Sequence, residues 1–225
     1  MFPSFFCGFD GREFLSARVW RRSLILAIAF AISSVAIATT VVPPTFEALV
    51  DDAEQICRLQ VTRLESRASI TGGRKVVHTY VHGKVVRPLK GELGETIVLR
   101  LLGGKADGVR MSVVDMPTFR VGETHVVFLR GNGRAFCPLV GVMYGGYRVE
   151  RNAQSGEERV LRSNGEPLRQ TSDVRTAMSQ EHTKSGSVAA RAAGGAAMTV
   201  NQFEHAIVQQ VAARSLNGIR SKEVK

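Results

Sequence analysis

The sequence predicts a mainly β protein: a small antiparallel barrel of about five to seven strands, with a short helix before it and a separate helix after it. Apolar residues recur at every second position through much of residues 74–129, the pattern of a sheet with one buried and one wet face. The clearest stretch places three valines on one face, Val77, Val81 and Val85, and polar residues on the other, His78, Tyr80, His82 and Lys84. Gly- and Pro-rich turns separate the segments, as expected for short strands.

Residues 1–38 are predicted to be a secretory signal peptide. Arg21 and Arg22 precede a long apolar stretch, and Ala36-Ile37-Ala38 is a small-x-small cleavage site. The alternative is an uncleaved membrane anchor to about residue 42, because about 20 uncharged residues suffice to span a bilayer. Either reading places the protein outside the cytoplasm: periplasmic, secreted or anchored by its N-terminal segment.

The formal charge of the whole chain is +10. Removing residues 1–38 takes away four arginines and two acids and leaves +8. A basic surface favours anionic partners such as acidic polysaccharides, lipid headgroups or nucleic acid. Export makes nucleic acid an unlikely partner and leaves an anionic glycan or an envelope protein, with the membrane itself a partner if the N-terminal segment is uncleaved.

The predicted barrel domain covers residues 45–151. Thr45 can cap a short helix in TFEALVDDAEQI. A first strand follows at residues 56–66, whose more apolar set is expected to face inward: Cys57, Leu59, Val61 and Arg63. Gly72-Gly73 turns the chain into the second strand, which ends near Pro88. Further strands are expected at residues 95–104, 109–114 and 124–130.

Beyond residue 130 the sequence predicts a turn, one more strand of the sheet, a flexible linker and a C-terminal helix. Asn132-Gly133 indicates a two-residue hairpin. A polar last strand at residues 146–151 is expected at a sheet edge. Residues 152–198 have the composition of a flexible linker. Residues 199–215 are predicted to form an amphipathic helix, with Thr199 and Gln202 as a capping box and an apolar stripe that needs a partner.

Three segments in this order, TFEALVDDAEQI, VVRPLKGELGETIVLRL and FRVGETHVVFL, resemble the netrin-like, or tissue-inhibitor-of-metalloproteinases-like, version of the OB-fold. They are also similar to a loose set of uncharacterised exported bacterial proteins. The resemblance covers residues 45 to about 150 and implies a five-stranded Greek-key barrel with a flanking helix. It does not imply protease inhibition, because that chemistry uses a cysteine at the mature N-terminus. Here the predicted N-terminal residue is Thr39, and the next cysteine is Cys57.

No catalytic, cofactor or metal site is predicted. The GxSxG, HExxH and paired CxxC motifs are missing from the sequence. His78 and His82 would lie about 13 Å apart on one strand, too far to share an ion. His125 could pair with Asp107 or Asp115, but no nucleophile accompanies it. Cys57 and Cys137 could form a disulfide or remain buried free thiols, and the sequence leaves both open.

The function predicted from these observations is a non-enzymatic binding or structural module of the cell envelope. Its candidate ligand surface comprises Tyr80, His82 and Lys84 on the wet face of the second strand. Two alternatives remain: an extracytoplasmic hydrolase using loop residues in 101–118 and 131–146, and a protein that docks a partner through its C-terminal helix.

Overall fold

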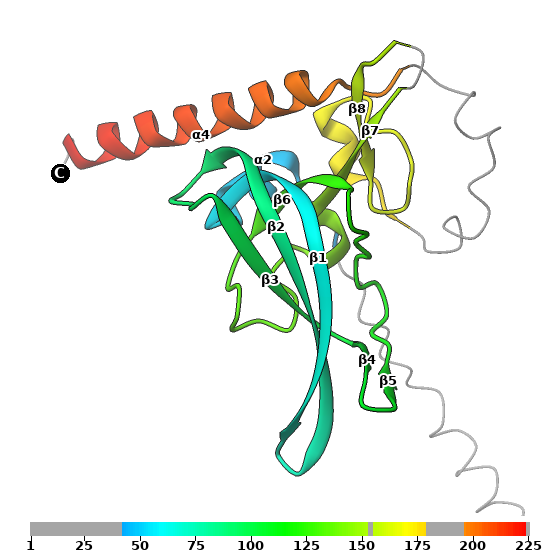
Figure 1. Cartoon of the computed structure of the whole chain (residues 1–225). Helices are drawn as coiled ribbons and strands as arrows, with labels where there is room; N and C mark the ends of the chain where they lie inside the picture. Colours follow the sequence, from blue (N-terminus) through cyan, green and yellow to red (C-terminus); the bar gives the residue numbers. More distant parts are fainter. Residues whose placement is uncertain (1–41, 153–154, 179–195, 224–225) are drawn as a thin grey trace, which may run out of the picture. The chain divides into compact units, whose positions relative to one another are not determined.

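A computed structural model describes residues 42–152, 155–178 and 196–223. The predicted signal peptide or anchor, residues 1–38, lies outside them. In the described part, the main sheet is antiparallel and six-stranded, with the order β3-β2-β1-β6-β7-β8 (Figure 1). Its strands are β1 (Gln55–Thr71), β2 (Arg74–Lys90), β3 (Thr96–Leu102), β6 (Thr124–Leu129), β7 (Gly146–Arg151) and β8 (Glu158–Arg162). A separate hairpin comprises β4 (Gly104–Ala106) and β5 (Val109–Met111).

Strands β1 and β2 form a long twisted hairpin around Gly72 and Gly73, which both have positive φ. Only the first six residues of β1 also pair with β6. The pairing of β1 with β2 shifts register between Val61 and Arg63, leaving Thr62 without a partner in the ladder. A bulge of this kind reverses the alternation of side chains. Val61, which precedes the bulge, is buried. Arg63 follows the bulge and is therefore exposed, although simple alternation placed it inward.

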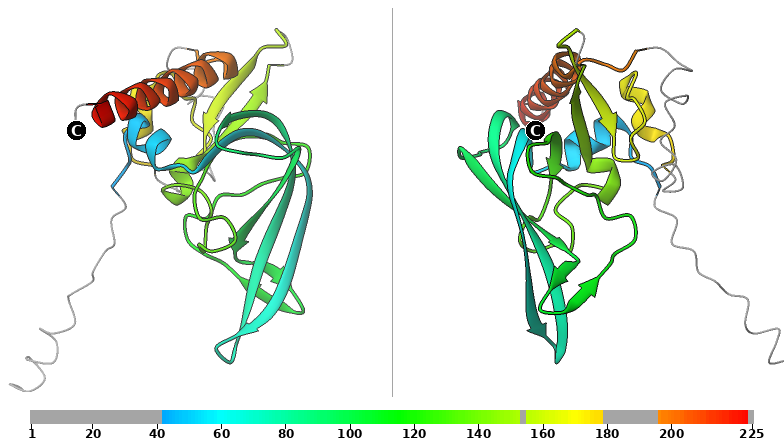
Figure 2. Two further views of the ribbon diagram at one scale, coloured as in Figure 1. Left: turned by 90° about the vertical axis from the view of Figure 1, so that its left-hand side faces the viewer. Right: turned by 45° about the vertical axis from the view of Figure 1, so that its right-hand side comes forward.

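Two helices cover part of the sheet. Helix α2 (Phe46–Asp52) begins where predicted, with the Thr45 hydroxyl accepting a hydrogen bond from Ala48 N–H. Helix α4 (Val200–Glu223) lies against α2, β2 and β8 (Figure 2). The predicted capping box is confirmed: Thr199 N–H donates to Gln202 Oε1, and Gln202 N–H donates to Thr199 Oγ1. Among the described residues, no helix combines the length and apolar character needed to cross a membrane.

The apolar stripe of α4 is used within the molecule. Phe203 and Ile207 are fully buried, and the Phe203 ring packs on Tyr147 and Phe46 with centroid distances of 4.9 and 6.0 Å. This core continues under β6, β7 and β8. A second core lies between the inner faces of β1, β2, β3 and β6 and includes Cys57, Leu59, Leu99 and Val127.

A fully buried carboxylate fixes α4 to the strands. Glu204 is 0% exposed, and its Oε2 accepts a hydrogen bond from Arg87 Nη1 at 2.7 Å. Its Oε1 lies 3.1 Å from Arg58 Nε, and Arg58 also pairs with Glu158 on β8. The network ties α4 to β1, β2 and β8, so α4 is part of the folded domain.

The connection between β6 and β7 lies along the free edge of β3. The Asn132 carboxamide donates to Val98 O at 2.8 Å and accepts from Arg100 N–H at 3.2 Å. Leu102 N–H donates to Phe136 O at 2.7 Å. The chain therefore curls from β6 back toward β3, but the hydrogen-bonded strand order still ends at β3 and β8, so the described structure is mainly β without a closed barrel.

Three further expectations were wrong. The described part of the predicted linker is structured: β8 pairs with β7, the 3₁₀ turn η3 (Thr171–Arg175) follows, and Val160, Leu168 and Val174 are buried. Strand β7 is consequently interior rather than at an edge. Asn132-Gly133 does not form a two-residue hairpin, because the isolated bridge between Leu129 and Leu139 closes a longer loop around it. The turn η2 (Val142–Gly145) follows this loop and leads into β7.

Candidate functional site

The predicted ligand surface lies on the outer face of β2, and the register adds basic residues beside it. Tyr80 is opposite Glu65 on one side and Arg100 on the other; His82 is opposite Arg63 and Val98. Lys84 continues the same row, opposite Gln60 and Thr96. We call the following set the basic face: Arg63, Arg67, His78, Tyr80, His82, Lys84 and Arg100.

Cations outnumber acids on this face. Four are Arg or Lys, and the carboxylate among them is Glu65, which lies 3.1 Å from Arg63 and also accepts a hydrogen bond from Arg67 Nε. That hydrogen bond is the main cause of a lowered pKa of Glu65, so the carboxylate stays charged. The Arg63 and Arg67 side chains are 60% and 61% exposed and keep donors free for a ligand.

Planar groups lie among the charges. The Arg67 guanidinium carbon is 5.2 Å from the centroid of the Tyr80 ring, a cation–π contact. Arg63 Nη2 lies 3.0 Å from His82 Nε2, and because a guanidinium can only donate, the imidazole nitrogen accepts. Burial, followed by the nearby charge of Arg100, lowers the pKa of His78. His78 therefore stays neutral at neutral pH.

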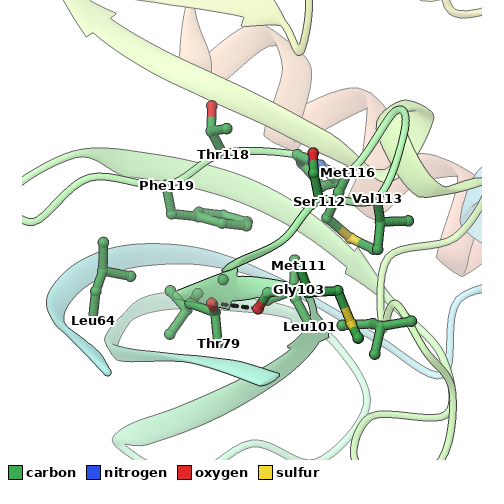
Figure 3. A pocket seen from close by; sticks show the side chains of 14 residues that line it. Leu64, Thr79, Leu101, Gly103, Met111, Ser112, Val113, Met116, Thr118 and Phe119 are labelled. Carbon is green, nitrogen blue, oxygen red and sulfur yellow. Dashed lines mark hydrogen bonds between the residues drawn. The ribbon is translucent and has the colours of Figure 1, made fainter. Parts of the chain in front are cut away.

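A pocket of about 280 Å³ lies on the opposite, inner face of the same strands (Figure 3). Thr79 and Val81 alternate with Tyr80 and His82 along β2, so they point into this pocket and away from the basic face. Its lining comes from β1, β2, β3, the start of the β4–β5 hairpin, β5 and the segment 112–119, with no titratable side chain among the lining residues. The loop region 101–118, proposed above for a hydrolase, thus contributes apolar side chains, backbone and hydroxyls to the pocket.

A buried histidine lies close to the pocket. His125 is 5% exposed, its Nε2 is 3.1 Å from Glu123 Oε2, and its ring packs on Phe119 at a centroid distance of 4.8 Å. Burial lowers the pKa of His125, and Glu123 opposes that effect. The partner is Glu123 rather than Asp107 or Asp115. The i, i+2 spacing, which puts two side chains on one face of a strand, was the signal that could have identified it.

Cys57 and Cys137, the cysteines of the described part of the chain, are buried free thiols. Burial raises the pKa of both, that of Cys57 to about 12, so neither is a thiolate at neutral pH. Within residues 42–152, 155–178 and 196–223, no three His, Cys, Asp or Glu side chains are grouped so as to hold a metal ion. The chain matches no protein-family model, and no curated protein matches it significantly in sequence.

Proposed function

We propose that this chain is an exported binding module, built on an open OB-like barrel, whose basic face binds an acidic glycan of the cell envelope. The observation that carries the proposal is that Arg63, Arg67, Lys84 and Arg100 share one face of three adjacent strands with Tyr80, with Glu65 as the carboxylate among them. If residues 1–38 are not cleaved, the same module is tethered to the membrane.

Two features support an OB-like reading of the fold. Strand β1 is long, strongly coiled and shared between β2 and β6, as in a Greek-key barrel. The Asn132 contacts with β3 bring the β6–β7 connection to the edge that a closing strand would occupy. Both agree with the proposed netrin-like resemblance, although fold similarity by itself carries no function.

An acidic glycan fits the chemistry of the face. Guanidinium groups bind carboxylate and sulfate oxygens through two parallel hydrogen bonds, and Tyr80 and His82 add flat surfaces against which a sugar ring can lie. An extended polymer can contact cations on three strands at once. The basic face has no nucleophile paired with a base, which favours binding over hydrolysis. The apolar stripe of α4 is buried in its own domain, which favours binding through the sheet over docking through α4.

The proposal is tested with polygalacturonate as a polycarboxylate probe and neutral dextran as its uncharged counterpart. Lys84→Glu reverses an exposed charge for which the described residues provide no ion pair. We expect binding of polygalacturonate, measured by isothermal titration calorimetry, to weaken about tenfold or more in Lys84→Glu and to weaken with added salt. Arg175→Glu on η3 is the matched control for net charge.

Equal effects of Lys84→Glu and Arg175→Glu would show that attraction depends only on net charge, and would contradict a site on the basic face. Binding of dextran as strong as that of polygalacturonate would contradict recognition of charge. If neither polymer binds but an envelope protein is retained through Lys84, the partner class proposed here is wrong.

A further inference from the structure

We infer that the pocket on the inner face of β2 and β3 is a second binding site, for one hydrocarbon chain of about ten carbon atoms. This site is separate from the basic face, because alternate residues of β2 point to the two sites. Its lining includes Leu64, Val81 and Leu101 from the strands. Met111, Met116 and Phe119 line it from β5 and the segment that follows (Figure 3).

The pocket forms where the chain leaves β3. Gly103 and Gly104 have φ of 107° and 131°, a conformation that glycine adopts readily. A Cβ at Gly104 would lie 2.4 Å from Thr79 Oγ1, so the β4–β5 hairpin can approach the strands closely only without a side chain there. The chain then returns through residues 112–119 across the apolar side chains, leaving a space between this segment and the sheet.

The half-buried hydroxyl of Thr79 in the lining needs no ligand. Thr79 Oγ1 donates to Gly103 O at 2.8 Å and lies 3.0 Å from Ser66 Oγ, so it is satisfied within the protein. Ser112 and Thr118 are exposed and contribute hydroxyls at the rim. A pocket with apolar walls, no charge and a satisfied hydroxyl favours an apolar occupant over a sugar or an ion.

The volume of the pocket and the flexibility of its methionine side chains indicate that the occupant is a hydrocarbon chain. A cavity of about 150 Å³ with apolar walls holds one benzene molecule, so about 280 Å³ has room for roughly ten carbon atoms. Met111 and Met116 have unbranched, polarisable side chains that can follow the shape of a flexible occupant. The absence of a charged group from the lining indicates that the head group of such a molecule stays outside, at the rim.

The test uses uncharged 1-alkanols from hexanol to dodecanol, so that the basic face does not contribute. Methyl-13C methionine labelling reports the site directly: we expect the Met111 and Met116 methyl signals to shift, and those of Met143 and Met198, which do not line the pocket, to stay. Affinity should rise by up to about fourfold per added methylene and level off near ten carbons, when the pocket is full.

Two variants connect the effect to the pocket. Leu64→Phe adds volume inside it and should weaken decanol binding at least tenfold, while Val98→Phe adds the same kind of ring on the outer face of β3 and should leave binding unchanged. Urea unfolding of both confirms that the fold is kept; Val113→Phe replaces Leu64→Phe if the latter does not fold. Equal shifts at these two pairs of methionines, no levelling with chain length, or unchanged binding in the filled variant would overturn the inference.

Discussion

Arg87 Nη1 donates a hydrogen bond at 2.7 Å to Glu204, a carboxylate on α4 that is 0% exposed. Arg58 lies on its other side, 3.1 Å away, so the charge of Glu204 is balanced by two arginines from neighbouring strands. Because a buried carboxylate is tolerated only with such partners, this network explains why a helix separated in sequence belongs to the domain.

Removing Glu204 should be costly. Glu204→Ala leaves Arg58 with Glu158 alone and Arg87 without its acid, and removing one partner of a buried ion pair typically costs about 3–5 kcal/mol. We expect a loss of that order in the free energy of unfolding, measured with urea. Arg87→Ala should cost less, since Arg87 is half exposed and Arg58 still faces Glu204. A loss below about 1 kcal/mol in Glu204→Ala would show that the network does not hold α4.

Gly83 should tolerate no side chain. A Cβ at this buried glycine would lie 2.2 Å from Leu59 Cδ1 and 3.1 Å from Gln60 O, both on the paired strand β1. We expect Gly83→Ala to lower the free energy of unfolding by about 1–3 kcal/mol. Gly94→Ala is the control, because its nearest atom would be 3.8 Å away and its φ is not positive. Similar stability of the two variants would argue against this close approach.

Asn132 should hold the β6–β7 connection to the edge of β3. Asn132→Ala removes two hydrogen bonds to the backbone of Val98 and Arg100, and we expect a loss of about 1–2 kcal/mol. The sharper readout is hydrogen exchange: the Arg100 amide should exchange faster in the variant, whereas the Leu99 amide should be unaffected. Asn201→Ala, an exposed site in the first turn of α4, serves as control. Unchanged exchange at Arg100 would contradict the contact.

His125 should make stability depend on pH. Burial lowers its pKa below 6.5, so the unfolded chain takes up a proton at a higher pH than the folded protein does. Stability is therefore full above about pH 6.5 and decreases as the pH falls through the folded-state pKa. We expect the loss between pH 7.5 and 5.5 to be smaller in His125→Gln than in the parent, measured by urea unfolding. Equal losses would assign the dependence to other groups, such as His78, whose pKa is also lowered.

Cys57 and Cys137 should be unreactive in the native state. Both are buried with raised pKa values, so a thiol reagent should label them only in denaturant. Two thiols per chain released on unfolding of a product that begins after residue 38 would confirm free cysteines. If no thiol reacts in denaturant without added reductant, the two cysteines form the disulfide that the sequence left open.

Local pattern was sufficient to predict several elements. Alternation along β2 assigned its two faces correctly, and the spacing of Thr199, Gln202, Phe203 and Ile207 predicted both the start of α4 and its buried side. These are properties of one element, so neighbouring residues carry the whole signal.

Features that depend on the pairing of strands, or on contacts between elements distant in sequence, were not predicted from the sequence. The bulge at Thr62 reverses the direction of Arg63 and so adds it to the basic face, but a register shift leaves no trace in single-strand alternation. Strand β8 is short and rich in charge, and Val160 and Leu168 become core residues only because α4 and β7 cover them. The burial of Glu204 depends on Arg58 and Arg87, which are distant in sequence, so periodicity along α4 could not identify it.

The most direct measurement of the central claim is a titration of the isotopically labelled protein with polygalacturonate oligomers, followed by backbone and arginine side-chain NMR signals. The account predicts that the largest shift changes occur at Arg63, Arg67, Tyr80, His82, Lys84 and Arg100, with little change on α4. Shift changes concentrated on α4 or η3, or none at all at oligomer concentrations that saturate a polyanion site, would contradict it.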